Sequence, residues 1–392
     1  MPHDLLSLGT PFWVEQTPPE EWIAVASQCT LSRNLSDFAF PSQCSDDERR
    51  AVEGRVLDAM ERINLFGAGR YFSGGELNSL FWQFLGERRL ASRELLHAHG
   101  SRGIYVSEDQ SFSVMVNGAD HVVFRQLLGG MFPREAWQGV NRHDDSLSGL
   151  LDFAFDGRLG FLTSRLGMVG TGLRAGVLLH LPALGAGGGL EDKSQSVRQF
   201  GLDLFGLLPG DQTAPMPGPP QGRAFSRADA PDPGWEPVSQ QCLLTDLEGG
   251  VCTGARQTVG DLYLLVNQES LGVTEDEIVF RVAHGAAELV QEEHQARMAL
   301  HRRGALTLED RVYRALSLAR GARLLGFCEA ADLLSQVRLG AALGILDGPA
   351  PRQLTGLLLA CQGAHLSLLR EAGTEPESLS AARAALLREA LG

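Results

Sequence analysis

The chain has 392 residues, of which 44% are hydrophobic and 21% charged, and its formal net charge is −14. This composition is typical of an ordinary globular protein, and the length is enough for two or three domains with cores of their own. The acidic balance argues against general binding to nucleic acids or anionic membranes, because both need a basic surface. No run of about 18 apolar residues could span a membrane, and no basic segment followed by an apolar core marks a secretion signal. We therefore expect a cytoplasmic protein.

The first half of the chain predicts a helix followed by several strands. Ser45 is a suitable N-cap, and acidic and then helically spaced apolar residues follow it up to residue 63. Further on, "SFSVMVN" (111–117) alternates polar and apolar residues and predicts a strand, with a tight turn at "SEDQ" before it. Similar patterns later in the segment 102–182 predict an antiparallel sheet with helices packed on one side.

A segment rich in proline and glycine, at about 206–241, interrupts this pattern. It predicts a flexible surface insertion within a domain, because "GDLYLLVNQ" after it again predicts a strand. The chain then becomes helical, and Thr274 followed by Glu277 is a capping-box pattern. The sequence thus predicts a first domain of residues 1–272 that contains the insertion, and an all-α C-terminal domain of residues 273–392. The apolar faces of that second domain could mediate dimerisation.

Polar clusters give weaker signals. His143, Asp144 and Asp145 are adjacent rather than convergent, so an exposed polar loop is a better interpretation than a metal site or a general base. The cysteines form no CxxC pair and have no histidine at metal-ligand spacing, so we expect no metal site. The segment 162–182 is more informative, because its glycine-containing loop precedes a strand, a backbone arrangement that often holds phosphate.

Taken in order, the motifs resemble those of the phosphagen (ATP:guanido) kinase family, most closely its bacterial protein-arginine kinase branch. The similar segments include "TLSRNLSDFAFP", "RGIYVSEDQSFSVMVNGADHV", "LGFLTSRLGMVGTGLRAGVLLHLPAL", "VGDLYLLVNQESLG" and "LEDRVYRALSLARGARLL". The resemblance implies an α+β fold, with an antiparallel sheet flanked by helices followed by an all-α domain. It also implies phosphate transfer from Mg-ATP to a guanidinium group, with arginines on the phosphates, two glutamates on the guanidinium and a cysteine beside it.

On the nucleotide side, this chain departs from the pattern that the resemblance implies. Gln28 and Thr30 stand in place of two phosphate-facing arginines, and Val123 stands in place of another. Arg125 lies two residues past Val123, faces the same side of an extended strand and could substitute, although on its own it is typical of a solvated surface arginine. The candidate nucleotide- or phosphate-binding residues are Arg174, Gly170, Thr171, Gly172, Arg125 and Arg165, and the family's Arg33 and Asn34 also persist.

On the guanidinium side, the implied catalytic groups are replaced. Ala119 stands in place of one glutamate and Arg165 in place of the cysteine. The second glutamate falls on Gly254 when counted back from "VGDLY". A different placement puts it on Gly210, beside Asp211. The sequence therefore offers no intact catalytic residue, and Arg165 would itself need an anion, either a phosphate or a carboxylate.

The helical part also departs from the protein-arginine kinase branch. The resemblance implies an Arg-Asp-x-x-Arg-Ala motif that reads phosphoarginine, and here Arg383 and Ala384 remain while Leu379 and Ser380 replace the first pair. We do not expect a phosphoarginine pocket in this region.

These replacements predict a catalytically impaired pseudokinase. Each lost charge-assisted hydrogen bond is worth about 1.5–3 kcal/mol, whereas a micromolar to millimolar ligand gains only about 4–8 kcal/mol of binding free energy in total.

We expect a regulatory or protein-binding module whose partner is an active protein-arginine kinase or a second copy, with no nucleic-acid or membrane partner. The alternative is an active ATP:guanido phosphotransferase that uses Mg-ATP in a rearranged site. It requires Arg125, Arg165 and Arg174 to converge near an acidic residue. A third hypothesis is a sensor that binds phosphate or guanidinium without turnover.

Overall fold

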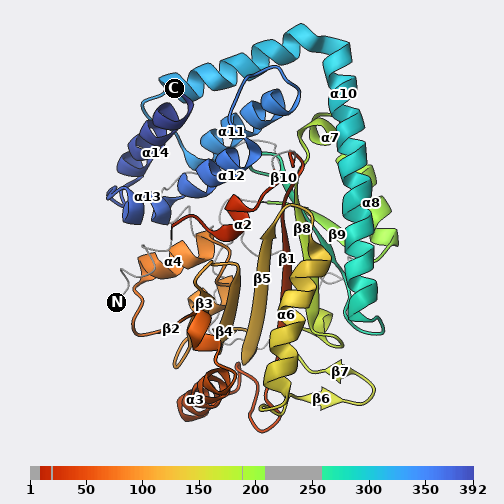
Figure 1. Cartoon of the computed structure of the whole chain (residues 1–392), viewed down its shortest axis with the longest axis vertical. Helices are drawn as coiled ribbons and strands as arrows, with labels where there is room; N and C mark the ends of the chain where they lie inside the picture. Colours follow the sequence, from red (N-terminus) through yellow and green to blue (C-terminus); the bar gives the residue numbers. More distant parts are fainter. Residues whose placement is uncertain (1–8, 19–20, 188, 208–257) are drawn as a thin grey trace, which may run out of the picture.

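An eight-stranded sheet with the order β2-β3-β4-β5-β1-β8-β10-β9 forms the centre of the computed structural model (Figure 1). Every neighbouring pair of strands in this sheet is antiparallel. The strands are β1 (Ala24–Arg33), β2 (Gly69–Ser73), β3 (Gly103–Ser107), β4 (Phe112–Val116), β5 (Val122–Gly129), β8 (Leu173–His180), β9 (Leu202–Gly206) and β10 (Leu262–Asn267). The structure describes residues 9–18, 21–187, 189–207 and 258–392. Nearly all of the predicted insertion, together with Gly210, Asp211 and Gly254, lies outside these ranges.

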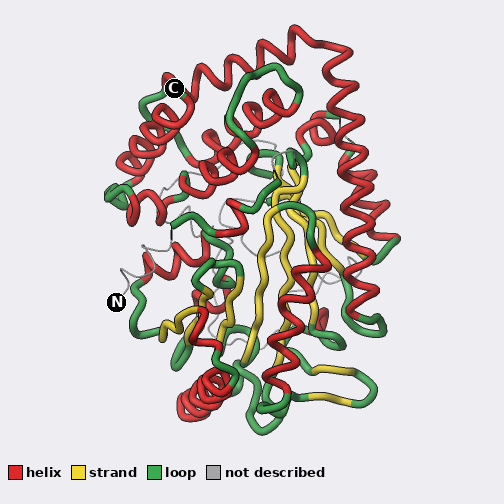
Figure 2. Tube along the Cα trace, in the orientation of Figure 1, coloured by secondary structure: helices red, strands yellow, loops and turns green. Residues whose placement is uncertain are grey.

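Helices cover both faces of this sheet, so the prediction that they pack on one side is wrong. One face packs against α3 (Asp46–Arg62), α6 (Pro133–Ser148) and the first half of α10 (Glu275–Gly321), and Figure 2 shows α6 crossing in front of the strands. The other face packs against α4 (Ser79–Glu87), α5 (Arg93–His97) and α12 (Pro351–Ala360). Because side chains alternate along a strand, each central strand contributes to both layers.

Several local predictions are confirmed. The Ser45 hydroxyl accepts the N–H of Glu48 and the Glu48 carboxylate accepts the N–H of Ser45, which begins α3 as a capping box. The hairpin β3–β4 turns at residues 108–111, as the alternation predicted. At the start of α10, the Thr274 hydroxyl accepts the N–H of Glu277.

The prediction of an exposed polar loop at residues 143–145 is wrong, because these residues belong to α6. Asp144 is buried, and its Oδ2 lies 2.7 Å from Nη2 of Arg33 on β1. The helical periodicity was missed because most of the last two turns of α6 is polar and faces solvent.

The C-terminal helices form a core of their own beyond a kink in α10. The backbone of Gly304 is non-helical (φ −156°, ψ 53°), and α10 changes direction there (Figure 1). Before the kink, α10 packs on the sheet, and after it α10 packs on α11 and α14. The division of the chain at residues 272 and 273 stays a prediction, since α10 runs from the sheet into the helical core. The helices of this region are α11 (Phe327–Ala342), α12, α13 (Gly363–Leu369) and α14 (Pro376–Leu391).

Short elements complete the described chain. They are α2 (Phe12–Glu15), α7 (Pro182–Ala186), α8 (Leu190–Gln199), the 3-10 turns η1 (Leu65–Ala68) and η2 (Leu166–Met168), and a small hairpin of β6 (Phe155–Asp156) and β7 (Gly160–Phe161). None of the helices in the described ranges combines the length and the apolar character that a membrane crossing needs.

A buried ion pair joins α10 to the end of the sheet. The Glu293 carboxylate is fully buried, lies 2.7 Å from Nε of Arg297, and accepts the N–H groups of Ala183 (3.1 Å) and Leu184 (2.9 Å). Arg297 also donates from Nη2 to the backbone oxygen of His180 (3.0 Å). Both charges therefore have hydrogen-bonding partners, which buried ions require.

We predict that Glu293→Ala lowers the free energy of unfolding by about 3–5 kcal/mol, because it leaves the Arg297 guanidinium buried without a counter-charge and removes the acceptor of two amides. Urea denaturation followed by circular dichroism measures the change. Glu277→Ala is the control on the same helix, because the Glu277–Arg281 pair is solvent-exposed and should contribute less than about 1 kcal/mol. Equal losses in the two variants would contradict the role given to the buried pair.

Candidate functional site

Three neighbouring strands place two arginines on either side of one threonine. In the register of the sheet, Thr30 of β1 is paired with Arg125 of β5 on one side and with Arg174 of β8 on the other. Directly paired residues of antiparallel strands point to the same face. The two arginines therefore flank Thr30 on the face opposite to the core residues Cys29 and Leu31.

A small cavity of about 50 Å³ opens on this face, between the strands, α5 and the loop before β8. It brings together Arg125, Arg165 and Arg174, which is the convergence that the active-enzyme alternative required. Two carboxylates, from Glu94 and Asp120, line the same cavity. Its complete lining is Gln28, Thr30, Ser32, Ser92, Glu94, Ala119, Asp120, Val123, Arg125, Arg165, Met168 and Arg174.

Arg125 is buried, with 5% of its surface exposed, so its interpretation as a solvated surface arginine is wrong. Nη1 of Arg125 donates to the backbone oxygen of Arg89 (2.9 Å), and its Nε donates to the Thr30 hydroxyl (3.4 Å). Burial and the neighbouring Arg89 charge lower the pKa of Arg125 to about 9. The guanidinium therefore keeps its charge at neutral pH, but part of its donor capacity is used within the protein.

Among the three arginines of this cavity, Arg174 has buried N–H groups that make no hydrogen bond within the described residues. Its Nε and Nη2 are buried and have no hydrogen-bond partner among the described residues. These two N–H groups lie on one edge of the guanidinium, the edge that binds a carboxylate or phosphate through two parallel hydrogen bonds. Burial and the Arg165 charge lower the pKa of Arg174 to about 10, so it remains a cation at neutral pH. The site therefore suits an anion.

Arg165 pairs with Glu94 across the mouth of the cavity. The backbone that carries Arg165 is held firmly, because its carbonyl accepts the Thr163 hydroxyl (2.8 Å) and the Met168 N–H (2.9 Å). Beside it, the Ser164 N–H donates to Oδ1 of Asp120 (2.6 Å). Burial lowers the pKa of Arg165. At the position where the resemblance implies a thiolate, the chain thus carries a cation that is already paired.

The glycine loop lies outside this cavity. The N–H of Gly170 donates to Phe161 and that of Thr171 donates to Ser270, so these two amides are not available to a phosphate. A side chain at position 170 would meet the Ser270 oxygen at 2.1 Å, and φ is +117° there, which explains the glycine. Gly170, Thr171 and Gly172 do not line the cavity, and their role in phosphate binding stays a prediction.

The retained Arg33 and Asn34 hold the surrounding loops together. Arg33 is 2% exposed, donates to Asp144 and to the Thr171 oxygen (2.9 Å), and lies 3.5 Å above the ring of Phe161. Asn34 donates to Oδ1 of Asp120 (2.7 Å). Both side chains are engaged within the protein.

His121, in the turn before β5, belongs to the same network. Its backbone N–H donates to Oδ1 of Asn34 (2.9 Å), and its ring Nδ1 accepts the N–H of Leu35 (3.1 Å). Burial lowers the pKa of His121 to about 4, so the ring is neutral at pH 7. A proton on Nδ1 would remove the acceptor of the Leu35 amide.

Sequence reasoning missed Ser92 and Glu94, which line the cavity from the segment after α4, and Arg89, which contacts the lining residues Gln28 and Arg125. Arg89 has a positive φ of 63°, and its Nη2 donates to Oε1 of Gln28 (3.1 Å). None of the three falls within a motif of the resemblance. The only signal in the sequence was the high density of charged residues in "ERRLASRE" (87–94). Such a density more often marks a segment exposed to solvent than a binding site.

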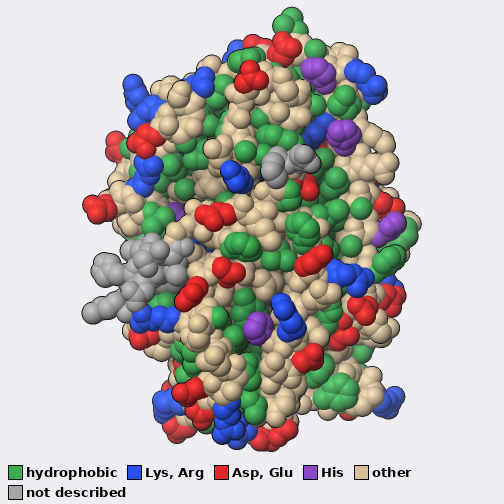
Figure 3. Space-filling model, viewed as in Figure 1, with side chains coloured by type: hydrophobic (Ala, Val, Ile, Leu, Met, Phe, Trp, Pro, Cys, Tyr) green, Lys and Arg blue, Asp and Glu red, His purple; other side chains and the backbone are tan. Residues whose placement is uncertain are grey.

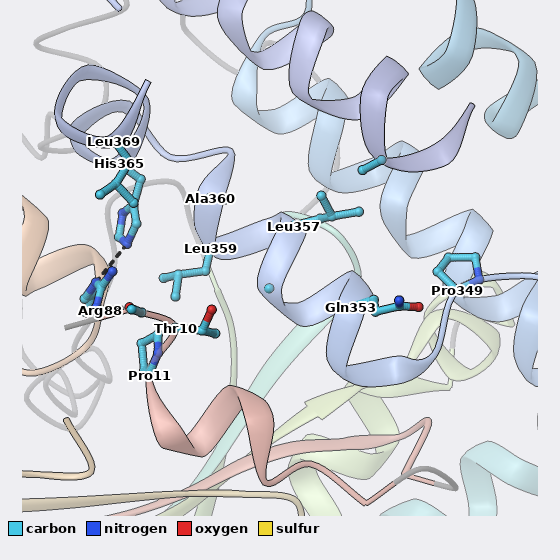
Figure 4. A pocket seen from close by; sticks show the side chains of 13 residues that line it. Thr10, Pro11, Arg88, Pro349, Gln353, Leu357, Leu359, Ala360, His365 and Leu369 are labelled. Atoms are coloured by element: carbon cyan, nitrogen blue, oxygen red, sulfur yellow. Dashed lines mark hydrogen bonds between the residues drawn. The ribbon is translucent and has the colours of Figure 1, made fainter. Parts of the chain in front are cut away.

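The other end of this segment lines a second cavity, of about 630 Å³, between the residues before α2 and the helices α12 and α13 (Figure 4). There Arg88 donates from Nε to Nε2 of His365 (3.2 Å), and Nδ1 of His365 lies 2.6 Å from Glu87. The Glu87 carboxylate also accepts the N–H groups of Ala364 and His365 at the start of α13. The segment 87–94 thus connects the helical core to the arginine cavity.

The face of the molecule that carries α6 bears both signs of charge (Figure 3). On the face drawn in Figure 3, the described Lys and Arg side chains lie interspersed with Asp and Glu side chains.

Comparisons with known proteins match both parts of the chain. The family model of the ATP:guanido phosphotransferase C-terminal catalytic domain matches residues 51–216, and that of the protein-arginine kinase McsB C-terminal domain matches residues 305–392. The chain is 32% identical to the protein-arginine kinase of Desulforamulus reducens over 382 residues, which are 97% of this chain and 95% of the relative. It is 29% identical to the protein-arginine kinase of Bacillus subtilis over 97% of this chain and 93% of the relative.

Solved structures of phosphagen kinases share the fold. Lombricine kinase is similar with a TM-score of 0.51 and 18% identity, over 73% of this chain and 71% of that chain. The substrate-free duplicated taurocyamine kinase of Schistosoma mansoni is similar with a TM-score of 0.52 and 19% identity, over 76% of this chain and 38% of that chain.

We predict that acid destabilises the wild-type protein more than a His121→Asn variant. The lowered pKa means that neutral His121 contributes stability that is complete above the unfolded-state pKa of about 6.5 and is lost as the pH falls toward 4. The asparagine oxygen can accept the Leu35 N–H without titrating. Between pH 7 and pH 4, the free energy of unfolding should fall by about 3 kcal/mol more in the wild type. Parallel pH profiles in urea denaturation would contradict this assignment.

We also predict that Arg174→Met raises the free energy of unfolding by about 1 kcal/mol, because it removes buried donors that have no acceptor. Inorganic phosphate, at concentrations on the order of 10 mM, should raise the melting temperature of the wild type and leave that of the variant unchanged. Arg125→Met is the matched control, since its guanidinium has acceptors; it should destabilise by about 1–3 kcal/mol. A destabilised Arg174→Met protein would show that the guanidinium is satisfied.

Proposed function

The chain belongs to the ATP:guanido phosphotransferase family, in its protein-arginine kinase branch, and from this premise we propose that it is a catalytically impaired member that acts as a regulatory or protein-binding module. One observation carries the proposal. The cavity at the implied meeting point of phosphate and guanidinium presents Gln28, Thr30 and Val123 in place of cations, and the carboxylate of Glu94 is already paired with Arg165.

The energetics support impairment. Three absent phosphate contacts remove roughly 4–9 kcal/mol if each made one charge-assisted hydrogen bond, although such losses are not strictly additive. A micromolar to millimolar ligand has about 4–8 kcal/mol of binding free energy in total. Arg125 replaces one lost cation, but two of its nitrogens bind Arg89 and Thr30. Nucleotide binding of the family's strength is therefore not expected.

The alternative, an active protein-arginine kinase with a rearranged site, is favoured by the convergence of Arg125, Arg165 and Arg174 on one cavity. In that case the unpaired edge of Arg174 would hold a phosphate of Mg-ATP, and Glu94 would hold the substrate guanidinium after releasing Arg165. Phosphoryl transfer depends mainly on positioning and charge neutralisation, so new residues could in principle supply both.

For the protein-binding role, we propose a partner that is either an active protein-arginine kinase or a second copy of this chain, seated on the helical part. Exposed apolar side chains on α10 beyond its kink support this surface, with Leu306 79% and Tyr313 51% exposed. These two residues are seven apart, so they lie on one face of the helix.

We predict that isothermal calorimetry detects no saturable binding of Mg-ADP or Mg-ATP at about 1 mM nucleotide, and that incubation with Mg-ATP and an arginine-rich protein yields no phosphoarginine. An active protein-arginine kinase treated in the same way is the positive control. Saturable binding together with phosphoarginine that disappears in Arg174→Met would establish the alternative. Binding without transfer would support a nucleotide-sensing form of the impaired protein.

A further inference from the structure

The ion pair between Arg165 and Glu94 places a guanidinium inside the chain's own site. We propose that Glu94 is a guanidinium-binding group and that Arg165 fills it from within the chain, as an internal substitute for the arginine side chain of another molecule. The inference rests on the proposed function, because it supplies a physical reason for the impairment. The position implied for a substrate guanidinium lacks the implied glutamate and cysteine, and the Arg165 guanidinium already occupies it.

The geometry around Arg165 favours this role over a chance surface contact. Two hydrogen bonds to its carbonyl fix the residue at the start of η2, and the bond from Ser164 to Asp120 fixes the preceding residue. The next residue, Leu166, is 90% exposed, so the loop itself borders solvent. Its arginine nevertheless turns inward to line the cavity rather than outward to water.

The carboxylate is equally well positioned. Glu94 lies in the first turn of α5, where the Ser92 hydroxyl caps the Leu95 N–H (3.3 Å). Leu95 is fully buried and anchors the turn in the core on this face of the sheet. The Glu94 side chain keeps 30% of its surface exposed and that of Arg165 keeps 27%. An external guanidinium could therefore reach Glu94 once the Arg165 side chain is absent.

The charges in the cavity make the carboxylate necessary for such binding. Arg125 and Arg174 line the same cavity, so their positive charges repel a guanidinium that enters it. A guanidinium ligand enters against this repulsion only where a carboxylate accepts its N–H groups. Oδ1 of Asp120, the other carboxylate of the lining, already accepts Asn34 and the Ser164 N–H, which leaves Glu94 as the better acceptor. The planar fork of a guanidinium matches two carboxylate oxygens better than an ammonium ion does.

The test removes the internal guanidinium and supplies an external one. Arg165→Ala should bind N-ethylguanidinium with a dissociation constant in the millimolar range, measured by chemical-shift titration. Wild-type protein and the double variant Arg165→Ala/Glu94→Gln should bind it at least about tenfold more weakly. Ethylammonium should also bind Arg165→Ala more weakly, because it lacks the planar fork. Arg158→Ala, which removes an exposed arginine in the β6–β7 hairpin, is the matched control and should behave like the wild type.

Two outcomes would overturn the proposal: no binding of N-ethylguanidinium by folded Arg165→Ala, or binding that survives the loss of the Glu94 charge. Urea denaturation establishes that each variant is folded, which we expect because partly exposed ion pairs contribute little to stability. Failure of the proposed function gives a different signal. Phosphate transfer to arginine by the wild type would contradict impairment, whereas the titrations of the variants would still decide the role of Glu94.

Discussion

A guanidinium group that leaves water must place its N–H groups on acceptors, and this requirement shapes much of the protein. Arg297 meets it with a buried carboxylate and a carbonyl, and Arg383 with the carbonyls of Cys361 and Leu325. Each of these arginines therefore joins segments that are distant in the chain. Arg174 is the exception among the cations of the cavity, because two of its buried donors have no acceptor in the described structure. This exception lies in the cavity between β1, β5 and β8.

The fold has kept the framework of that site while its charges have changed. Strand β1 lies between β5 and β8, and its residues alternate between the core layer that contains Cys29 and Leu31 and the side of the cavity. Replacing an arginine by Thr30 on the cavity side leaves Cys29 and Leu31 on the core side undisturbed. The core side of the sheet therefore does not depend on the charge at position 30. Arg383 illustrates the same separation in the helical part, where one residue of the phosphoarginine motif remains as a buried structural link.

Local patterns predicted the elements well, because caps, turns and alternation are properties of a few neighbouring residues. Ser45 at the start of α3 and the hairpin between β3 and β4 are of this kind. Ion pairs between residues far apart in the chain could not be predicted in the same way. Asp144 pairs with Arg33 across 111 positions, and Glu94 meets Arg165 across 71, so neither charge revealed its partner locally. The resemblance supplied the fold and the degenerate positions, but it contained no information about residues outside the shared motifs.

The segment 87–94 contacts the helical core at one end and the arginine cavity at the other. At one end, Glu87 holds the first turn of α13 through two amides and a histidine. At the other end, the carbonyl of Arg89 holds Arg125, and Glu94 holds Arg165. A molecule that displaced α13 would therefore act on the same segment that carries Glu94. If such a molecule changed the affinity of the cavity for a ligand, that ligand would, by thermodynamic reciprocity, change the affinity of the helical surface for the molecule by the same factor.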